Sequence, residues 1–301
     1  MISLPKSHKQ AQFYVITATI LISGSFFASQ KLVGTLTPAA LTLLRFIIAA
    51  LLLAPFVLLS PNRRSKLFTT LPRAFIISLF YSLYFMIMFE ALKTTTVLNT
   101  GTIYTLVPFA TALLSYFIFK EKIDKKRLFA FLIGAVGTLW VIFEGNLELF
   151  LKFNLQEGDG LFFFGSLSMC IYSILLKALY KNDDLLVLVF STLLGGIFWM
   201  SIGTLYFKTG WGSFSINIEF IFCLLYLAIA TTIVTLYLLQ SATVVLGPVK
   251  VMSYVYLNPI IVAVLMLFLE GKSIPLVLIP GILLSVLATF MLQLSKSKKG
   301  A

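Results

Sequence analysis

The chain has 301 residues, of which 59% are hydrophobic and only 11% are charged, and its mean hydropathy is +1.02. Soluble globular domains carry about 25% charged residues, so this composition excludes an ordinary water-soluble domain. The 23 Lys and Arg exceed the 11 Asp and Glu, which gives a net charge of +12, but they stand in short clusters between long apolar runs. That pattern disfavours a nucleic-acid partner and is typical of cytoplasmic loops between membrane spans.

Ten apolar segments are long enough to cross a bilayer, because about 20 apolar residues cover roughly 30 Å of hydrocarbon. The first is too long for a signal-peptide core and has no small-x-small cleavage site, so we expect it to remain in the mature protein. The sequence therefore predicts an all-α polytopic membrane protein with ten transmembrane helices. The predicted spans are residues 11–32, 37–60, 71–92, 97–119, 127–145, 160–180, 184–206, 217–239, 247–269 and 274–294.

The placement of lysine and arginine predicts the orientation. Sixteen of them fall in segments on the N-terminal side of the membrane and five in segments on the other side, with Lys250 at a boundary and Arg45 inside a span. Because positive charge resists translocation, both termini are predicted to be cytoplasmic. The longest segment on the other side, residues 144–160, carries four acidic residues and one lysine, which fits the exterior.

The second half of the chain repeats the first. Pro108 in LVPFATALLSYFIFKEK aligns with Pro259 in LNPIIVAVLMLFLEGK, and GAVGT at 134–138 aligns with GILLS at 281–285. Each copy would hold five spans, and an odd number of spans in tandem gives the two copies opposite orientations in the membrane. The predicted five-helix repeats are residues 1–145 and 146–301.

Three stretches carry a family resemblance: LLRFIIAALLL in span 2, EALKTTTVLNTGTIYTLVPFATALLSYFIFKEK across spans 3 and 4, and LQSATVVLGPVKVMSYVYLNPIIVAVLMLFLEGK across spans 8 and 9. With ten spans in two repeats, they make the chain similar to the EamA family of the drug/metabolite transporter superfamily. The resemblance implies secondary transport of small organic solutes through a central cavity between the repeats, in a bacterial inner membrane. One departure is that Glu121 follows Pro108 by 13 residues whereas Glu270 follows Pro259 by 11, which predicts a shortened or tilted end of span 9.

Polar residues inside the spans indicate which faces look inward, because lipid-facing positions rarely keep them. The segments NTGTIYTLVP and PVKVMSYVYLNP are polar just before the two aligned prolines, and we place the solute there. An aromatic lining with few fixed charges suits an amino-acid-like or amphipathic solute, although tyrosines near span ends can also be interfacial anchors. The predicted substrate-binding residues are Arg45, Tyr81, Tyr84, Asn99, Tyr104, Tyr237, Tyr254, Tyr256 and Asn258.

Pro108 and Pro259 each remove one backbone donor, which a membrane helix tolerates only where neighbours or water satisfy the freed carbonyl. Proline is common in transmembrane helices, so a structural kink explains each one alone. Their matched positions beside polar residues favour a second interpretation, in which they shape the cavity or act as gate hinges.

Arg45 is a charged residue well inside a span, where an arginine costs at least about 2.5 to 3.5 kcal/mol, so it should face the bundle or a wet cavity. Three interpretations are open: an ion pair with Glu90 at a similar depth, capture of an anionic group of the substrate, or snorkelling and carbonyl capping. Phe190 or a neighbour takes the matched position in the second half. Glu90 is also the possible coupling residue, since proton-coupled carriers commonly place a carboxylate at membrane depth, but a facilitator or exchanger needs none.

The scarcity of histidine and cysteine limits the classes of protein to which this chain can belong. The single histidine, His8, precedes the first span, and the two cysteines, Cys170 and Cys223, fall inside spans. We therefore expect no metal, no cofactor and no disulfide, and the sequence has no P-loop, so we expect no ATP hydrolysis and no enzyme. A channel is disfavoured because no glycine-rich filter is present. The alternative that stays open is a carrier or flippase of a lipid-linked or amphiphilic substrate. The expected partners are a small-molecule substrate and the bilayer, and a monomer is compatible with the sequence.

Overall fold

The structure is a computed structural model and describes residues 4–32, 36–95, 97–206, 217–271 and 273–294. Its long elements are all helices, which confirms the all-α prediction. Several basic residues used to predict the orientation lie outside the described residues, namely Lys208, Lys272, Lys296, Lys298 and Lys299. The elements are α1 (His8–Lys31), α2 (Pro38–Leu58), α3 (Pro61–Ala91), α4 (Val97–Tyr104), α5 (Val107–Phe119), α6 (Lys125–Ile142), α7 (Leu147–Leu151), α8 (Glu157–Leu179), α9 (Leu185–Tyr206), α10 (Ile218–Ala228), η1 (Ile229–Val234), α11 (Thr235–Leu246), α12 (Pro248–Met252), η2 (Ser253–Leu257), α13 (Asn258–Glu270), η3 (Leu276–Leu278) and α14 (Ile279–Leu294).

Within the described residues, nine stretches are long and apolar enough to cross a membrane. In the described part of the chain, the one predicted span without such a stretch is the fifth, residues 127–145, which corresponds to α6; this helix has 18 residues and begins with Lys125, Lys126 and Arg127. Those three charges leave α6 with a shorter apolar run than its neighbours. The fold is therefore a polytopic helical bundle, and the tenth crossing stays a prediction.

Short polar residues and prolines fix where several helices begin. The side chains of Thr37, Asp124 and Asn217 cap α2, α6 and α10 by accepting a hydrogen bond from the backbone amide three residues further on. Each cap satisfies an amide that the first helical turn leaves free. Proline stands at the start of α2, α3, α5, α12 and α13, where its missing amide is tolerated.

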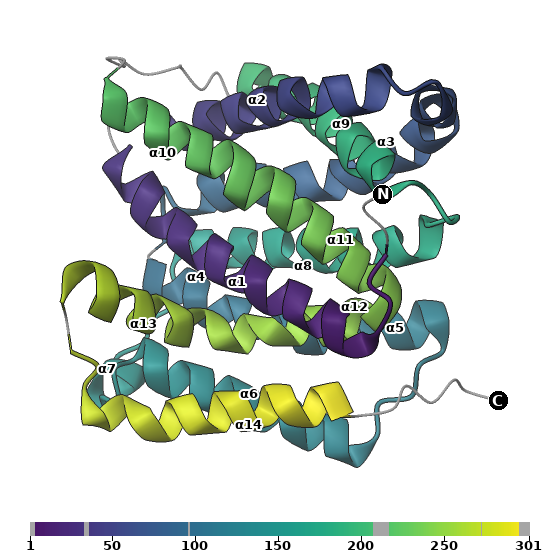
Figure 1. The fold of residues 1–301 in the computed structure, drawn as a ribbon. Coiled ribbons are helices and arrows are strands. Elements are labelled where there is room, and N and C mark those ends of the chain that lie inside the picture. The colour runs from purple at the N-terminus through teal and green to yellow at the C-terminus, as the bar shows by residue number, and fades with distance from the viewer. Residues whose placement is uncertain (1–3, 33–35, 96, 207–216, 272, 295–301) are drawn as a thin grey trace.

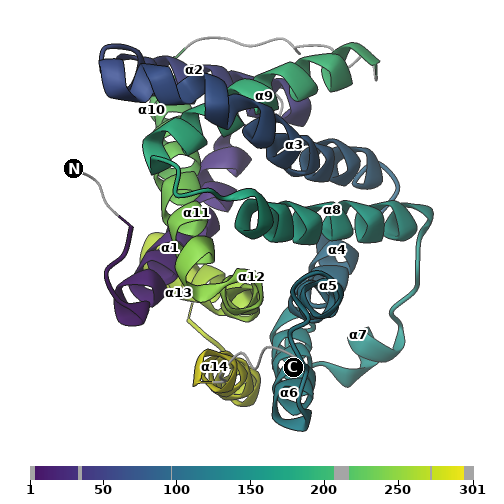
Figure 2. The same ribbon diagram turned by 90° about the vertical axis from the view of Figure 1, so that its right-hand side faces the viewer.

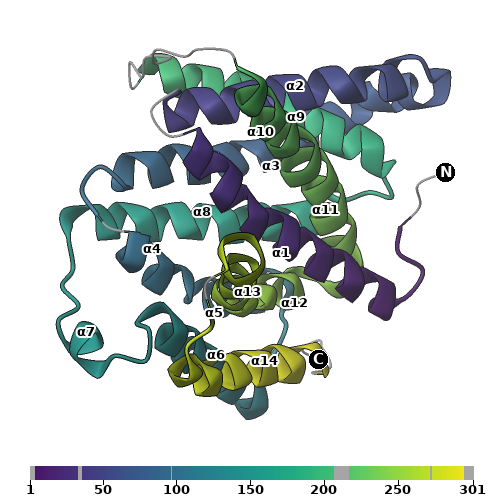
Figure 3. The ribbon, with the colours of Figure 1, turned by 60° about the vertical axis from the view of Figure 1, so that its left-hand side comes forward.

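The helices stack in successive levels, with α2, α3 and α9 at the top of Figure 1 and α6 beside α14 at the bottom. Between them lie α1, α8 and the α10–α11 span, and then α4–α5 and α12–α13, an order that Figures 2 and 3 show from two other sides. The start of α1, the α2–α3 junction and the end of α14 lie on the right of Figure 1. We call this the basic end, after Arg63, Arg73 and Arg127. The opposite end holds Asp159 and Glu219, and we call it the acidic end.

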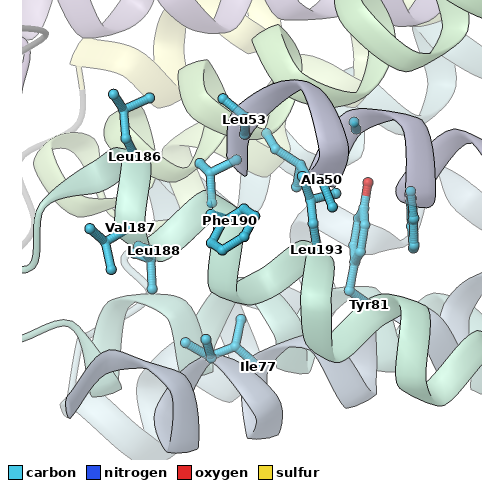
Figure 4. Close-up of a cluster of buried hydrophobic side chains, with 14 of the residues drawn as sticks. Ala50, Leu53, Ile77, Tyr81, Leu186, Val187, Leu188, Phe190 and Leu193 are labelled. Atoms are coloured by element: carbon cyan, nitrogen blue, oxygen red, sulfur yellow. The ribbon is translucent and has the colours of Figure 1, made fainter. Parts of the chain in front are cut away.

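A large buried apolar cluster joins α2, α3, α8 and α9. Figure 4 shows Phe190 of α9 inside this cluster, near Leu53 and Leu193, and the Phe190 side chain is only 4% exposed. Tyr81 of α3 stands at the edge of the same cluster. Phe190, the predicted second-half counterpart of Arg45, is thus an apolar core residue.

Small residues of α6 and α14 bring the two halves of the chain into close contact. A side chain at Gly137 would place its Cβ 2.7 Å from the amide nitrogen of Ser285, and one at Gly281 would place it 2.7 Å from the carbonyl oxygen of Gly137. Thr138 Oγ1 lies 3.3 Å from Ser285 Oγ, within hydrogen-bonding distance. Small residues therefore let these two backbones approach closely, as is common between membrane helices.

Both proline-containing spans are broken at matched places. Pro108 lies in the first turn of α5, after a short turn that follows α4, and Pro259 lies in the first turn of α13, after the 3₁₀ segment η2. Both α5 and α13 have 13 residues, and each is followed by a left-handed residue, Lys120 at φ 54° and Gly271 at φ 67°. The prediction of a shortened span 9 is therefore wrong, because both half-helices end 11 residues after their proline, at Phe119 and Glu270.

Candidate functional site

Arg45 of α2 reaches across to the eighth span, where the helix is interrupted by the π-helical segment η1. Its Nη2 donates to Oγ1 of Thr232 at 3.1 Å and to Oγ1 of Thr231 at 3.4 Å, and its Nε donates to Thr232 at 3.3 Å. A π-turn carries an extra residue, so it can turn two consecutive threonines to one partner, and such turns are frequent at functional sites.

The two threonine hydroxyls have a second partner that fixes their role. Oγ1 of Thr231 and Oγ1 of Thr232 each donate to the carbonyl oxygen of Leu227, at 2.9 and 2.8 Å. A hydroxyl has one hydrogen, so towards Arg45 both oxygens act as acceptors only. The guanidinium is thus held by neutral groups, and its charge is not cancelled by them.

The structure does not pair Arg45 with Glu90. Glu90 instead lies 2.6 Å from Nζ of Lys93, one turn further along the chain. Within the described residues no carboxylate forms an ion pair with Arg45. Of the three interpretations of Arg45, the ion pair with Glu90 is therefore wrong.

An aromatic cluster lies next to Arg45 and joins α3, α4 and α8. The ring of Tyr81 lies 4.9 Å from that of Tyr172 and 5.1 Å from that of Phe85, measured between centroids. Tyr84 lies 5.2 Å from Phe85 and 6.0 Å from Tyr104. Three of the predicted binding residues, Tyr81, Tyr84 and Tyr104, are thus brought together, and Tyr172 joins them. We call these four tyrosines the tyrosine cluster.

Polar atoms beside the tyrosine cluster are buried with unused hydrogen-bonding capacity. The hydroxyl of Tyr172 and Oε1 of Gln240 are both buried, and within the described part of the chain neither makes a hydrogen bond of normal geometry. The amide nitrogen of Gln240 donates to Thr192 at 3.2 Å. Buried polar groups are usually satisfied, so those that are not call for an explanation such as a ligand or a bound water.

Asn99 belongs to a different group at the acidic end. Its Nδ2 donates to Oδ2 of Asp159 at 2.7 Å and to the carbonyl oxygen of Asn154 at 3.0 Å. Asp159, which is 4% exposed, also accepts from Thr95 and from the amide of Gln156, so it ties the start of α4 to the start of α8. The sequence analysis did not single out Asp159. The signal was its place in the first turn of the sixth span, where a carboxylate caps the helix.

Ion pairs join α3 to the α8–α9 connection at the basic end. Nη2 of Arg73 lies 2.8 Å from Oδ1 of Asp183, and Nε of Arg63 lies 3.1 Å from Oδ2 of Asp184. Burial, with these two carboxylates nearby, raises the pKa of Tyr180 above its usual value. At the acidic end, Lys31 of α1 pairs with Glu219 of α10 at 2.7 Å, and that pair is largely exposed.

The remaining predicted binding residues lie apart from the tyrosine cluster. Tyr254 packs with α1 and α11, and Tyr256, which is 1% exposed, packs against α6 and donates to the carbonyl oxygen of Phe131 at 3.2 Å. Tyr237 lies at the margin of the α2–α9 core, and Asn258 starts α13. The binding roles of these four residues stay predictions.

A small cavity opens at the basic end, where α5 and α6 of one repeat meet α11, α12 and α14 of the other. Its volume is about 20 Å³, which holds a water molecule but no organic solute. The lining residues are Glu121, Arg127, Leu246, Gly247, Val249, Lys250 and Leu292.

The comparisons with known proteins agree with the fold. The model of the EamA-like transporter family matches twice, over residues 9–143 and 156–294. A curated relative, "Uncharacterized transporter YyaM" of Bacillus subtilis (strain 168), is 24% identical over 177 residues, a match that takes in 58% of this chain and spans only 58% of the relative. A solved structure described as "Crystal structure of protein" has a TM-score of 0.73 and 18% identity, over 95% of this chain and 97% of that one, and so shares the fold. Two family matches that together cover most of the chain show that it belongs to the EamA-like transporter family.

Proposed function

We propose that this protein is a secondary transporter that moves a small organic solute, amino-acid-like or amphipathic, by alternating access between the two repeats. The observation that carries the proposal is the pair of matched breaks at Pro108 and Pro259, each of which divides a span at the interface where α5 packs against α12. Discontinuous helices at a repeat interface are the usual place for a solute site in such carriers.

The tyrosine cluster supports the same position for the solute. It lies on α3, α4 and α8, so it includes residues from both repeats, and Arg45 stands beside it. A solute held there would contact both halves, which is the arrangement that lets a rocking motion expose one site to each side in turn.

The proposed setting is the inner membrane of a bacterium, with the basic end and both termini in the cytoplasm. The clusters at Arg63, Arg73 and Lys125 support this orientation through the positive-inside rule. Cysteine labelling of single-cysteine variants at the α2–α3 junction and in α7 would test it, because an impermeant reagent should reach only the second position in intact cells.

Uptake and counterflow in proteoliposomes test the transport proposal. The solutes are a mixed pool of amino acids, nucleosides and small metabolites, and wild type is compared with Tyr104→Ala and Tyr254→Ala. Saturable exchange that Tyr104→Ala impairs supports a carrier with its site at the cluster, and loss in Tyr254→Ala would extend that site to the ninth span. If well-inserted protein exchanges none of the solutes, the proposal fails and a lipid-linked substrate takes its place.

A further inference from the structure

The positive charge of the Arg45 guanidinium is not compensated by an anion among the described residues, and one of its nitrogens is not used as a hydrogen-bond donor. Nε and Nη2 are bound to Thr231 and Thr232, whereas Nη1 makes no hydrogen bond within the described part of the chain. The side chain is half-buried and keeps some accessible surface. A cation in this position normally has an anionic partner, because the desolvation of an unpaired charge is costly.

The surroundings of that free donor indicate what the missing partner is. Tyr81 of α3 stacks on Phe46, the residue that follows Arg45 in α2, with 5.8 Å between ring centroids, and Figure 4 shows the Tyr81 hydroxyl pointing towards α2. The hydroxyl can donate to an anion that Nη1 also binds. Next to it, the rings of Tyr84, Tyr104 and Tyr172 provide an apolar surface.

The charge of the site sets the charge of the ligand. Arg45 is the one cationic group at this position among the described residues, and its neighbours Thr231, Thr232, Gln240 and the tyrosines are neutral. One guanidinium balances one negative charge, and its planar donors match the two oxygens of a carboxylate. A phosphate dianion would leave about one negative charge uncompensated beside a single half-buried guanidinium.

We infer that the transported solute carries a carboxylate, which binds Nη1 of Arg45 and the hydroxyl of Tyr81, and an apolar or aromatic body that lies on the tyrosine cluster. Thr231 and Thr232 are positioning residues, since they hold the guanidinium without touching the solute. This inference rests on the proposed function, because it assigns the substrate class of that same site.

The test measures binding separately from transport. Purified protein is heated with leucine, leucinamide, phenylacetate or phenylacetamide, so that each carboxylate has a carboxamide of the same size that lacks the negative charge. We expect at least one carboxylate to raise the melting temperature while its carboxamide does not, because a ligand stabilises the state that binds it. Arg45→Gln should weaken that carboxylate at least about tenfold, as expected when one partner of a buried charge pair is removed.

Matched variants decide between specific and general effects. Arg64→Gln removes an exposed arginine of α3 and should leave the shift unchanged. Thr232→Val should reduce the affinity less than Arg45→Gln, since the charge stays but its orientation is lost. The inference is overturned if neither carboxylate stabilises the wild type, if both members of a pair stabilise it equally, or if Arg45→Gln keeps the full shift. Counterflow of the stabilising carboxylate then tests the proposed function itself. Binding without exchange would refute the proposal of transport, whereas the inference of a carboxylate-binding site would stand.

Discussion

Nη2 of Arg45 donates to Oγ1 of Thr232 at 3.1 Å, across 187 positions of the chain and between two spans of opposite repeats. The hydroxyl keeps its own hydrogen on the carbonyl of Leu227. Removal of the guanidinium therefore leaves no buried donor unsatisfied on either threonine.

The first prediction follows from that geometry. Arg45→Gln should leave the thermal stability unchanged or raise it, because an unpaired charge in a span costs at least about 2.5 kcal/mol. A purely structural arginine would instead destabilise the fold when replaced. Membrane insertion and the melting temperature, with Arg64→Gln as the control, measure the difference, and a clear loss of stability in Arg45→Gln would contradict our assignment.

The second prediction concerns the contact of α6 with α14. Gly137→Ala should destabilise the protein by about 1 to 3 kcal/mol, because the new Cβ would lie 2.7 Å from the backbone of Ser285 and force the helices apart. Gly160→Ala is the matched control, since nothing lies within 4 Å of its Cβ position in α8. It should be neutral or stabilise by up to about 1 kcal/mol. Denaturation followed by tryptophan fluorescence measures the stability of both variants. Equal effects would show that the contact between α6 and α14 leaves room for a side chain at Gly137.

The third prediction contrasts a buried ion pair at the basic end with an exposed ion pair at the acidic end. The side chains of Arg73 and Asp183 are 18% and 6% exposed, so Arg73→Gln should cost about 3 kcal/mol by leaving a buried carboxylate unpaired. Lys31 and Glu219 are 61% and 57% exposed, and Lys31→Gln should change the stability very little. Melting temperatures at low and high salt measure both variants, and a salt-sensitive loss in Lys31→Gln alone would contradict the contrast.

The fourth prediction concerns the pH dependence of the same exposed pair. The hydrogen bond to Glu219 raises the pKa of Lys31 above its ordinary value of 10.5. A raised lysine pKa gives stability that is complete below the ordinary value and is lost as the pH rises through the raised one. Melting curves of wild type and Lys31→Gln should therefore differ by a constant amount from about pH 6 to about pH 9 and converge only at higher pH. A difference that stays the same as the pH rises above about 10.5 would show that the pKa of Lys31 is not raised.

The fifth prediction separates Tyr256 from the tyrosine cluster. Tyr256→Phe removes one buried hydrogen bond to the carbonyl of Phe131 and should cost about 1 kcal/mol of stability with no change in the KM for transport. Tyr104→Ala, in contrast, should raise the KM. A higher KM in Tyr256→Phe would instead show that Tyr256 takes part in substrate binding, as the sequence predicted.

Hydropathy was sufficient to predict nine of the ten spans, and the positions of proline indicated where two of them are broken, because both signals depend on local sequence. The partners of Arg45 were not predictable in this way, since they depend on the π-turn at Thr231 and Thr232, which has no sequence signal of its own. The rotation of Tyr256 towards α6 was missed for a related reason. A span that is apolar on most sides gives no clear periodicity to show which face is inward.

The hydrogen-bonding contact between Thr138 and Ser285 has a consequence for how such a chain could arise. Thr138 and Ser285 are counterparts in the predicted inverted repeat, and a contact between counterparts is isologous, like the centre of a homodimer interface. A five-helix ancestor that paired with an oppositely inserted copy of itself could use this one self-complementary surface. Fusion of two such genes would then require no new interface, only the connection that residues 143–156 now provide.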